Sequence, residues 1–208
     1  MLEEVTLRKQ GCTKYLWMVK VVCVGNGGVG KTCLLMSYTN NDFVHGHIPT
    51  CADICEIVVN TNGAEKCLSL WDTAGTSDYD RLRPLSFPQT DVFILAYCCV
   101  SPASFEGIRE RCLPEVAHHC PEVPLYLVAT KADLRTDKEV LETLATKKLK
   151  PISSEDGERY AREIGATFFE TSALTGEGVR TLFETAAYID DLQVENNVEG
   201  KEKKCRIS

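Results

Sequence analysis

The segment that most constrains the fold is Gly25–Thr32, with the sequence GNGGVGKT, which fits the pattern G-x-x-x-x-G-K-[ST]. An apolar, valine-rich run, Leu16–Val24, comes directly before it, and a helix is predicted to begin near Lys31. The pattern is informative only where a glycine-rich loop joins a strand to a helix. Because that context is present, a chance match by an ordinary glycine-rich turn is the minority interpretation.

Further apolar runs alternate with segments of helical character along the chain. The predicted later strands are Cys55–Val59, Lys66–Trp71, Val92–Val100, Pro124–Thr130 and Thr167–Thr171. Asn62-Gly63 between the first two of these is a strong hairpin signal, so those two strands are predicted to pair antiparallel. The longer runs are continuous and apolar, as in parallel strands buried on both faces. The chain is therefore expected to form an α/β fold with a six-stranded, mostly parallel sheet flanked by helices.

Capping residues predict where some helices begin and end. Ser101 before Pro102 predicts an N-cap followed by proline at the first helical position. Ser153 with Asp156 predicts a second helix start, and Gly165 predicts the end of that helix.

The domain is predicted over residues 16–191, with its last helix from about 177 to 191. Segment 134–151 is charged and carries apolar residues at near-helical spacing, so it predicts a short surface helix inserted after the fifth strand. Residues 1–15 and 192–208 lack a convincing apolar period. They are predicted to be an N-terminal extension and a C-terminal tail.

The composition fits one globular domain. The chain has 208 residues, 44% of them apolar and 25% charged, which excludes a disordered, collagen-like or membrane-spanning chain. A formal net charge of -7 argues against nucleic acid as a partner. The 11 cysteines contain no C-x-x-C pair and predict reduced, packing thiols in the cytosol rather than a zinc site. Glu3 and Glu4 argue against a secretory signal, and the apolar run Val92–Val100 is far too short for a membrane helix.

The glycine-rich loop carries the chemistry of phosphate binding. Its glycines let successive backbone N–H groups point at a phosphate, and the helix that follows adds the positive end of its dipole. Lys31 is predicted to reach the terminal phosphates and the Thr32 hydroxyl to coordinate Mg²⁺. The residues assigned to this part of the site are Gly25, Gly27, Gly28, Val29, Gly30, Lys31, Thr32 and Cys33.

Asp72 and Gly75 lie where the third strand ends. A carboxylate at that edge of the sheet can hold the metal, although a plain strand-end cap is the alternative for Asp72. Gly75 leaves its own N–H free to approach a γ-phosphate without a Cβ in the way.

Two further groups follow the fifth and sixth strands. Thr130-Lys131-Ala132-Asp133 ends with a carboxylate, which can accept both the ring N–H and the exocyclic amine of guanine. Adenine offers no such pair of donors, so Asp133 predicts guanine over adenine. Ser172-Ala173, with Leu174 after it, supplies a small residue whose backbone N–H can meet the guanine carbonyl.

Together these motifs resemble those of the Ras-superfamily small GTPases, and the intervening sequence is similar to the Rac-like branch of the Rho family. The resemblance runs from about Trp17 to Tyr188 and is densest in Trp71–Gly75, Asp78–Phe93, Val100–Glu106 and Lys147–Ile152. It implies a P-loop NTPase G domain with a Rho-type helical insert, which binds GTP and GDP with Mg²⁺ and hydrolyses GTP. It also implies effector proteins, exchange factors, activating proteins and dissociation inhibitors as partners, and a link to the actin cytoskeleton.

The resemblance assigns roles in two switch segments. Thr50 would be the switch I threonine that ligates Mg²⁺ and touches the γ-phosphate, although Pro49-Thr50 alone is also compatible with a loop turn. Phe43 would pack beside the guanine, and Thr73–Leu85 would form switch II. The metal ligands would then be Thr32, Thr50 and Asp72. The catalytic residues would be Lys31, Thr50, Gly75 and Thr76.

Thr76 departs from the family pattern, which places a glutamine there to orient the attacking water. A short hydroxyl side chain cannot present a carbonyl and an amide at the same reach. Hydrolysis is therefore expected to be slow, whereas nucleotide binding is expected to survive. His47 for the usual tyrosine, the stretch Cys51–Cys55 without large aromatic residues, and Ser77 for an acidic residue are expected to alter effector and exchange-factor binding.

Three functions follow as alternatives. The first is a GTPase switch that cycles with the help of regulators but hydrolyses slowly. The second is an essentially non-hydrolysing scaffold that stays bound to GTP and is regulated by abundance or membrane release. The third, a P-loop kinase or ATPase, is disfavoured by Lys131 and Asp133.

The chain ends in Cys205-Arg206-Ile207-Ser208, a C-a-a-X pattern whose final serine favours farnesylation of Cys205. The residues just before it include Lys201, Lys203 and Lys204 but also two glutamates, which makes a poor polybasic arm. A prenyl anchor is therefore expected to give weak, reversible attachment of a cytoplasmic protein to the cytoplasmic face of membranes.

Overall fold

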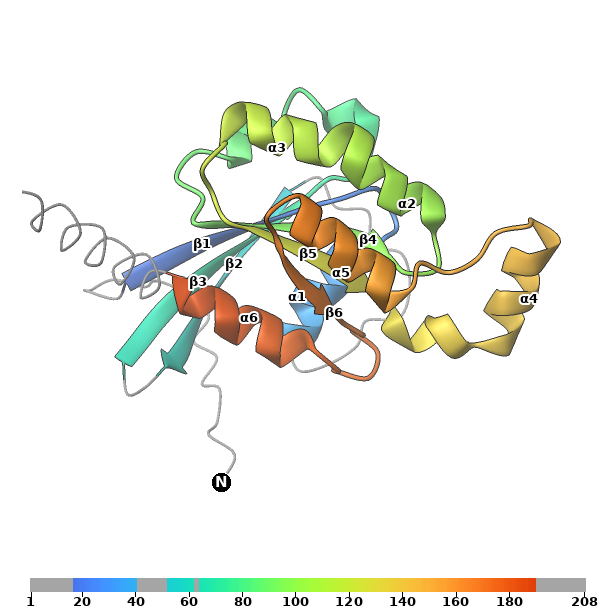
Figure 1. The fold of residues 1–208 in the computed structure, drawn as a ribbon. Helices are drawn as coiled ribbons and strands as arrows, with labels where there is room; N and C mark the ends of the chain where they lie inside the picture. Colours follow the sequence, from blue (N-terminus) through green and yellow to red (C-terminus); the bar gives the residue numbers. More distant parts are fainter. Residues whose placement is uncertain (1–16, 41–51, 62–63, 190–208) are drawn as a thin grey trace, which may run out of the picture.

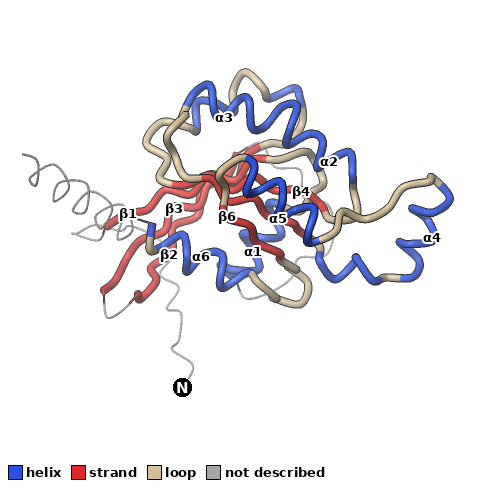
Figure 2. Tube along the Cα trace, viewed as in Figure 1, coloured by secondary structure: helices blue, strands red, loops and turns tan. Residues whose placement is uncertain are grey.

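One sheet organises the molecule in the computed structural model, which describes residues 17–40, 52–61 and 64–189. Its six strands lie in the order β2-β3-β1-β4-β5-β6. Their bounds are β1 (Trp17–Val24), β2 (Ala52–Thr61), β3 (Ala64–Thr73), β4 (Val92–Cys98), β5 (Leu125–Thr130) and β6 (Thr167–Glu170). β2 and β3 pair antiparallel, and the other neighbouring strands pair parallel. The predicted α/β architecture is confirmed (Figures 1 and 2), while the turn at Asn62-Gly63 lies outside the described residues.

Helices cover both faces of the sheet (Figure 1). One face packs against α1 (Lys31–Asn40) and α6 (Val179–Ala187), where Tyr38 stacks on Phe183 with ring centroids 4.4 Å apart. The other face packs against α2 (Pro102–Gly107), α3 (Leu113–His119) and α5 (Ser154–Glu163). Every residue of β4 is buried between these layers, as expected of a continuous apolar run in a parallel sheet.

The segment after β5 forms the insert predicted at 134–151. It contains a short 3-10 helix, η4 (Ala132–Thr136), and then α4 (Lys138–Thr146), which lies beside the body of the domain in Figure 1. The carboxylate of Asp137 caps α4 by accepting the N–H of Val140 at 2.9 Å. Leu144 is the buried residue of this helix, so α4 rests on the domain by a narrow apolar contact.

The predicted cap positions at Ser101, Ser153 and Gly165 are confirmed, although the Ser101 side chain makes no capping hydrogen bond. Ser153 accepts the N–H of Asp156 at 3.1 Å, and Gly165 ends α5 in the left-handed region at φ +69°. Ser101 does stand before Pro102 at the start of α2, but its hydroxyl makes no cap. The N–H of Ser104, which a capping hydroxyl would accept, donates instead to the carbonyl of Ser101 at 2.9 Å.

The start of α6 differs from the prediction, and the chain between α2 and α3 departs from regular α-helix. α6 begins at Val179, slightly later than predicted, because Gly178 before it adopts φ +69°. Between α2 and α3 the chain forms a π-helical turn over Ile108–Cys112. Pro114 follows this turn and has no N–H to donate to the carbonyl four residues earlier, which accounts for the widened register.

Within the described ranges, the cysteines are free thiols, and His, Cys, Asp and Glu residues form no cluster of three that could hold a metal. None of the helices over those same residues combines the length and apolarity needed to cross a bilayer.

Candidate nucleotide-binding site

The loop between β1 and α1 lies at the carboxyl edge of the sheet, where ligands bind in α/β folds. A Cβ on Gly25 would lie 2.2 Å from the carbonyl oxygen of Ala96 in β4, so the backbone there passes too close for any side chain. Gly28 and Gly30 have φ of +74° and +103°, which favour glycine. These positions give the loop the curled path that phosphate binding requires.

Lys31 lies inside this loop. Its ammonium donates to the carbonyls of Gly25 at 2.9 Å and Asn26 at 3.0 Å, and the residue is only 6% exposed. Burial lowers the pKa of Lys31, although the charge of Asp72 opposes that change. The loop carbonyls thus hold the ammonium of Lys31 inside the loop, and its reach to a terminal phosphate stays a prediction.

The predicted metal ligands Thr32 and Asp72 are neighbours. The Thr32 hydroxyl donates to the Asp72 carboxylate at 2.5 Å, and Asp72 is 5% exposed at the end of β3. Both offer hard oxygen ligands, and Mg²⁺ binds through one or two such protein groups together with phosphates and waters. This donor set therefore fits Mg²⁺. The third predicted ligand, Thr50, lies outside the described residues, as does Phe43.

Thr130 and Lys131 join the glycine-rich loop to the end of β5. The Thr130 hydroxyl shares its proton between the carbonyls of Val29 at 2.6 Å and Tyr97 at 2.9 Å. Lys131 lies over the loop and donates from its ammonium to Gly28 at 3.0 Å. The two motifs, far apart in sequence, therefore form one continuous surface.

Asp133 and Ser172 meet at the other end of this surface. Ser172 is fully buried, and its hydroxyl donates to the Asp133 carboxylate at 2.6 Å. The carbonyl of Ala173 accepts from Ser37 of α1 at 3.1 Å, while Leu174 is exposed. The structure thus brings the predicted base-selecting carboxylate and the predicted Ser172-Ala173 segment together.

A family model described as the Ras family matches residues 20–189. The chain belongs to the Ras family. It therefore carries the Ras-type G domain of a small GTP-binding switch, and its nucleotides are GTP and GDP.

Gly75 of this Ras-family protein lies on the backbone of the glycine-rich loop. A Cβ there would fall 2.4 Å from both the carbonyl carbon of Asn26 and the nitrogen of Gly27. Glycine is thus required by close packing, a reason that the sequence did not reveal. Thr76 follows as an exposed residue, with its γ-methyl directed toward Gly27.

Arg111 links these two segments and was missed by the sequence-based prediction. Its guanidinium donates to the side-chain oxygen of Asn26 at 2.8 Å and to the carbonyl of Gly75 at 2.9 Å. The Asn26 amide in turn fills the space that a Cβ on Gly107 would need, at 2.5 Å. No local pattern could have shown this, because the contact depends on the π-helical turn that carries Arg111.

Arg83 anchors the second half of segment 73–85, which the sequence resemblance assigns to switch II. Its buried guanidinium donates to Glu115 at 2.8 Å, to Asp80 at 2.6 Å and to the carbonyl of Ala74 at 3.1 Å. Hydrogen bonds to both carboxylates raise the pKa of Arg83 against the opposing effect of burial. The charged guanidinium therefore ties segment 73–85 to α3.

Replacing Arg83 with methionine in this Ras-family protein is expected to lower the free energy of unfolding by about 2–3 kcal/mol. The substitution leaves Glu115 without its buried partner, while the greater exposure of Asp80 reduces the loss. Urea denaturation followed by circular dichroism measures it. As a control, Arg159→Met removes an exposed ion pair with Asp156 and should cost less than about 1 kcal/mol. Equal losses in the two variants would contradict the role given to Arg83.

Proposed function

We propose that this protein is a Rho/Rac-type switch that binds GTP and GDP with Mg²⁺ and hydrolyses GTP slowly. The observation that carries the proposal is the hydrogen bond from the Lys131 ammonium to the carbonyl of Gly28. This contact joins the glycine-rich loop, which contains Lys31, to the segment that contains Asp133. When bound, Mg²⁺ would be held by Thr32 and Asp72 and would neutralise charge on the phosphates.

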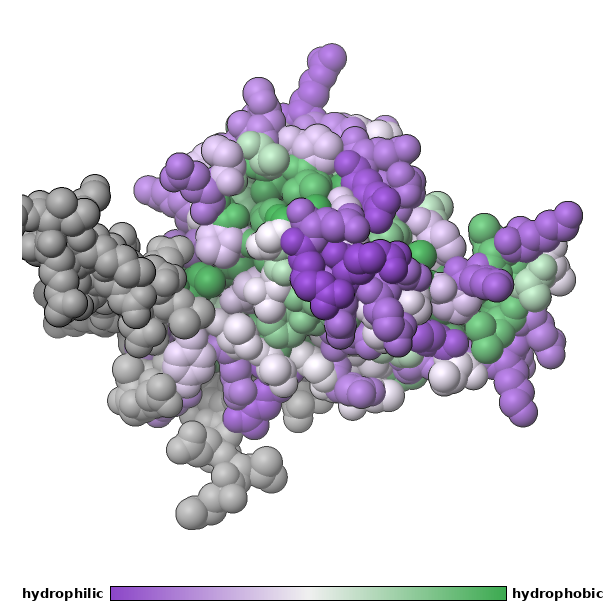
Figure 3. Space-filling model, viewed as in Figure 1, coloured by the Kyte–Doolittle hydropathy of each residue, from purple (hydrophilic) through white to green (hydrophobic). Residues whose placement is uncertain are grey.

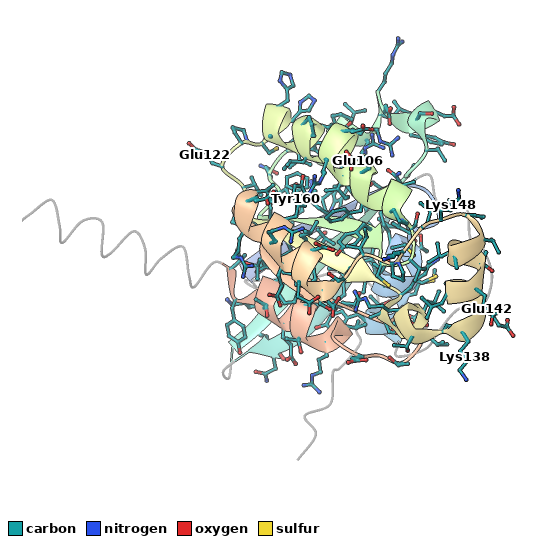
Figure 4. The ribbon with its side chains drawn as sticks, turned by 45° about the vertical axis from the view of Figure 1, so that its right-hand side comes forward. Glu106, Glu122, Lys138, Glu142, Lys148 and Tyr160 are labelled. Atoms are coloured by element: carbon teal, nitrogen blue, oxygen red, sulfur yellow. The ribbon has the colours of Figure 1, made fainter. Side chains whose placement is uncertain are left out.

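The insert supports the Rho/Rac type. α4 lies between β5 and α5, and the sequence resemblance implies a helix at this place. Figure 3 shows apolar residues over the insert, where Leu141 of α4 and Leu149 just after α4 are exposed. In Figure 4 the labelled side chains of this segment, Lys138, Glu142 and Lys148, point away from the body of the domain.

Thr76 supports slow hydrolysis. It is exposed at the start of switch II, where its methyl group lies toward Gly27 and its single hydroxyl is the one polar group of the side chain. A hydroxyl on so short a side chain cannot position water and the transferred phosphoryl group as an amide does. The side chains that bind nucleotide do not depend on residue 76, so affinity is retained.

The nucleotide that accompanies the purified protein tests this proposal. Protein isolated in the presence of Mg²⁺ is denatured with acid, and the released nucleotide is identified by chromatography. Slow hydrolysis is expected to leave a substantial fraction as GTP. Release of GDP alone would argue against it, and release of adenine nucleotides would argue against the whole assignment.

Effectors and regulators are proposed to dock on switch II. Leu82 and Leu85 are 56% and 75% exposed, and large apolar side chains exposed side by side in one segment are typical of interaction surfaces. The predicted changes at His47 and Cys51 lie outside the described residues.

Membrane attachment through Cys205 is likewise a proposal, since Cys205 lies outside the described residues. Cys205→Ser is expected to move the protein from the membrane fraction to the soluble fraction of cells, because the thiol is the prenyl acceptor of the C-a-a-X pattern. Cys120→Ser, which leaves that pattern intact, is the matched control. Fractionation followed by immunoblotting measures both, and unchanged membrane content of Cys205→Ser would rule out this anchor.

A further inference from the structure

An ion pair lies behind the base-selecting groups. Arg135 belongs to the same 3-10 helix, η4, as Asp133, and Glu170 ends β6 just before Ser172. The guanidinium of Arg135 donates to the carboxylate of Glu170. Two side-chain contacts therefore join the loop that carries Asp133 to the loop that carries Ser172. One is the hydrogen bond from Ser172 to Asp133, and the other is the ion pair between Arg135 and Glu170.

The turn that leads into Asp133 needs stabilising contacts. Lys131 adopts φ +57°, a left-handed conformation that is uncommon outside glycine, so the turn that delivers Asp133 is under local strain. A backbone hydrogen bond from Ala132 to the carbonyl of Thr171, at 3.1 Å, joins the loops between the two side-chain contacts. Cys99 also donates from its thiol to the carbonyl of Lys131 at 3.1 Å.

Two residues near the start of α5 hold the ion pair in place. The Nε–H of Arg135 donates to the carbonyl of Ile152 at 3.2 Å, and the Ser154 hydroxyl donates to Glu170 at 2.9 Å. Ile152 and Ser154 mark the end of the insert and the start of α5. Arg135 and Glu170 are only 21% and 30% exposed, so water screens the pair less than it screens a pair on the open surface.

We propose that Arg135 and Glu170 are positioning residues for guanine recognition. Neither side chain is proposed to contact the guanine base. They fix η4 against β6 and so hold Asp133 where its carboxylate accepts two hydrogen bonds from the base. The inference rests on the proposed guanine-nucleotide site. It adds that base selectivity depends on this pair, whereas the phosphate end, held by Lys31 and Thr130, does not.

Comparison of GDP with inosine diphosphate isolates the effect. Inosine keeps the ring N–H but lacks the exocyclic amine, so the ratio of the two affinities measures the second contact to Asp133. The wild-type protein is expected to prefer GDP by about 10–100-fold. Arg135→Ala is expected to reduce that ratio at least about fivefold, and Arg135→Lys, which keeps the charge, to restore part of it.

Controls separate positioning from general loosening. Arg159→Ala removes an exposed arginine of α5 and should leave the ratio unchanged. Thermal unfolding of each variant is measured in parallel, and Glu170→Gln provides a milder change if Arg135→Ala fails to fold. Equal losses of affinity for both nucleotides, or an unchanged ratio in both Arg135→Ala and Glu170→Gln, would overturn the proposal. If the wild-type protein itself failed to prefer GDP to ADP, the proposed function would fail instead.

Discussion

Thr76→Gln is expected to raise the rate of single-turnover GTP hydrolysis by about 10²–10³-fold, the usual contribution of one positioned polar group to transition-state stabilisation. The amide can accept from the attacking water and donate toward the transferred phosphoryl group, two contacts that threonine cannot make together. Because Thr76 is exposed, the longer side chain has room and should not disturb folding. The protein is loaded with radiolabelled GTP, mixed with Mg²⁺, and sampled for GDP.

Thr76→Ser is the matched control for this experiment. Serine keeps the hydroxyl and removes the methyl group that lies toward Gly27, so it tests whether crowding at the glycine-rich loop limits the rate. Its rate is expected to stay within about threefold of wild type, since neither side chain orients water as an amide does. If glutamine left the rate unchanged, or if serine alone restored it, residue 76 would not limit hydrolysis in the way proposed.

Asp133→Ala is expected to weaken the binding of both GTP and GDP by about 10²–10⁴-fold. The estimate comes from two hydrogen bonds to an ionised carboxylate, each contributing about 1.5–3 kcal/mol. Affinity for ATP, which makes neither bond, should change little. The hydroxyl of Ser172 loses its acceptor in this variant, so part of the effect comes from disorder at the base end of the site. Equilibrium titration with fluorescent guanine and adenine nucleotides measures both affinities.

Asp137→Ala provides the comparison. This aspartate lies close by in sequence and caps α4, so its loss should lower stability by about 0.5–2 kcal/mol without changing nucleotide affinity. Retention of guanine affinity in Asp133→Ala would show that another group selects the base. Equal losses of affinity in the two variants would show that the loop as a whole, rather than its carboxylate, is responsible.

Much of the fold could be predicted from sequence because its signals are local. Valine-rich runs, an Asn-Gly pair between short strands, and serine with aspartate at the start of α5 each specify conformation over a few residues. The order of motifs at strand ends was informative for a similar reason. In a parallel sheet the carboxyl ends share one edge, so Lys31, Asp72 and Asp133 had to come near one another.

The contacts that the sequence did not predict all join distant segments. Arg111 reaches Asn26 and Gly75 only because a π-helical turn redirects its helix, and Arg83 reaches Glu115 only once its own segment lies against α3. Pattern and propensity describe one element at a time, whereas these details depend on which elements pack together.

The central claim is that the loop around Lys31 binds a triphosphate with Mg²⁺ while Asp133 selects guanine as its base. Competitive calorimetry on the nucleotide-free protein tests it most directly, with GTP titrated in the presence of Mg²⁺ and then displaced by ATP. GTP is expected to bind about 10³-fold or more tightly than ATP, since a site built to hydrogen bond a ligand rejects an analogue that lacks those groups. Equal competition by ATP, or no association of either nucleotide, would contradict the claim.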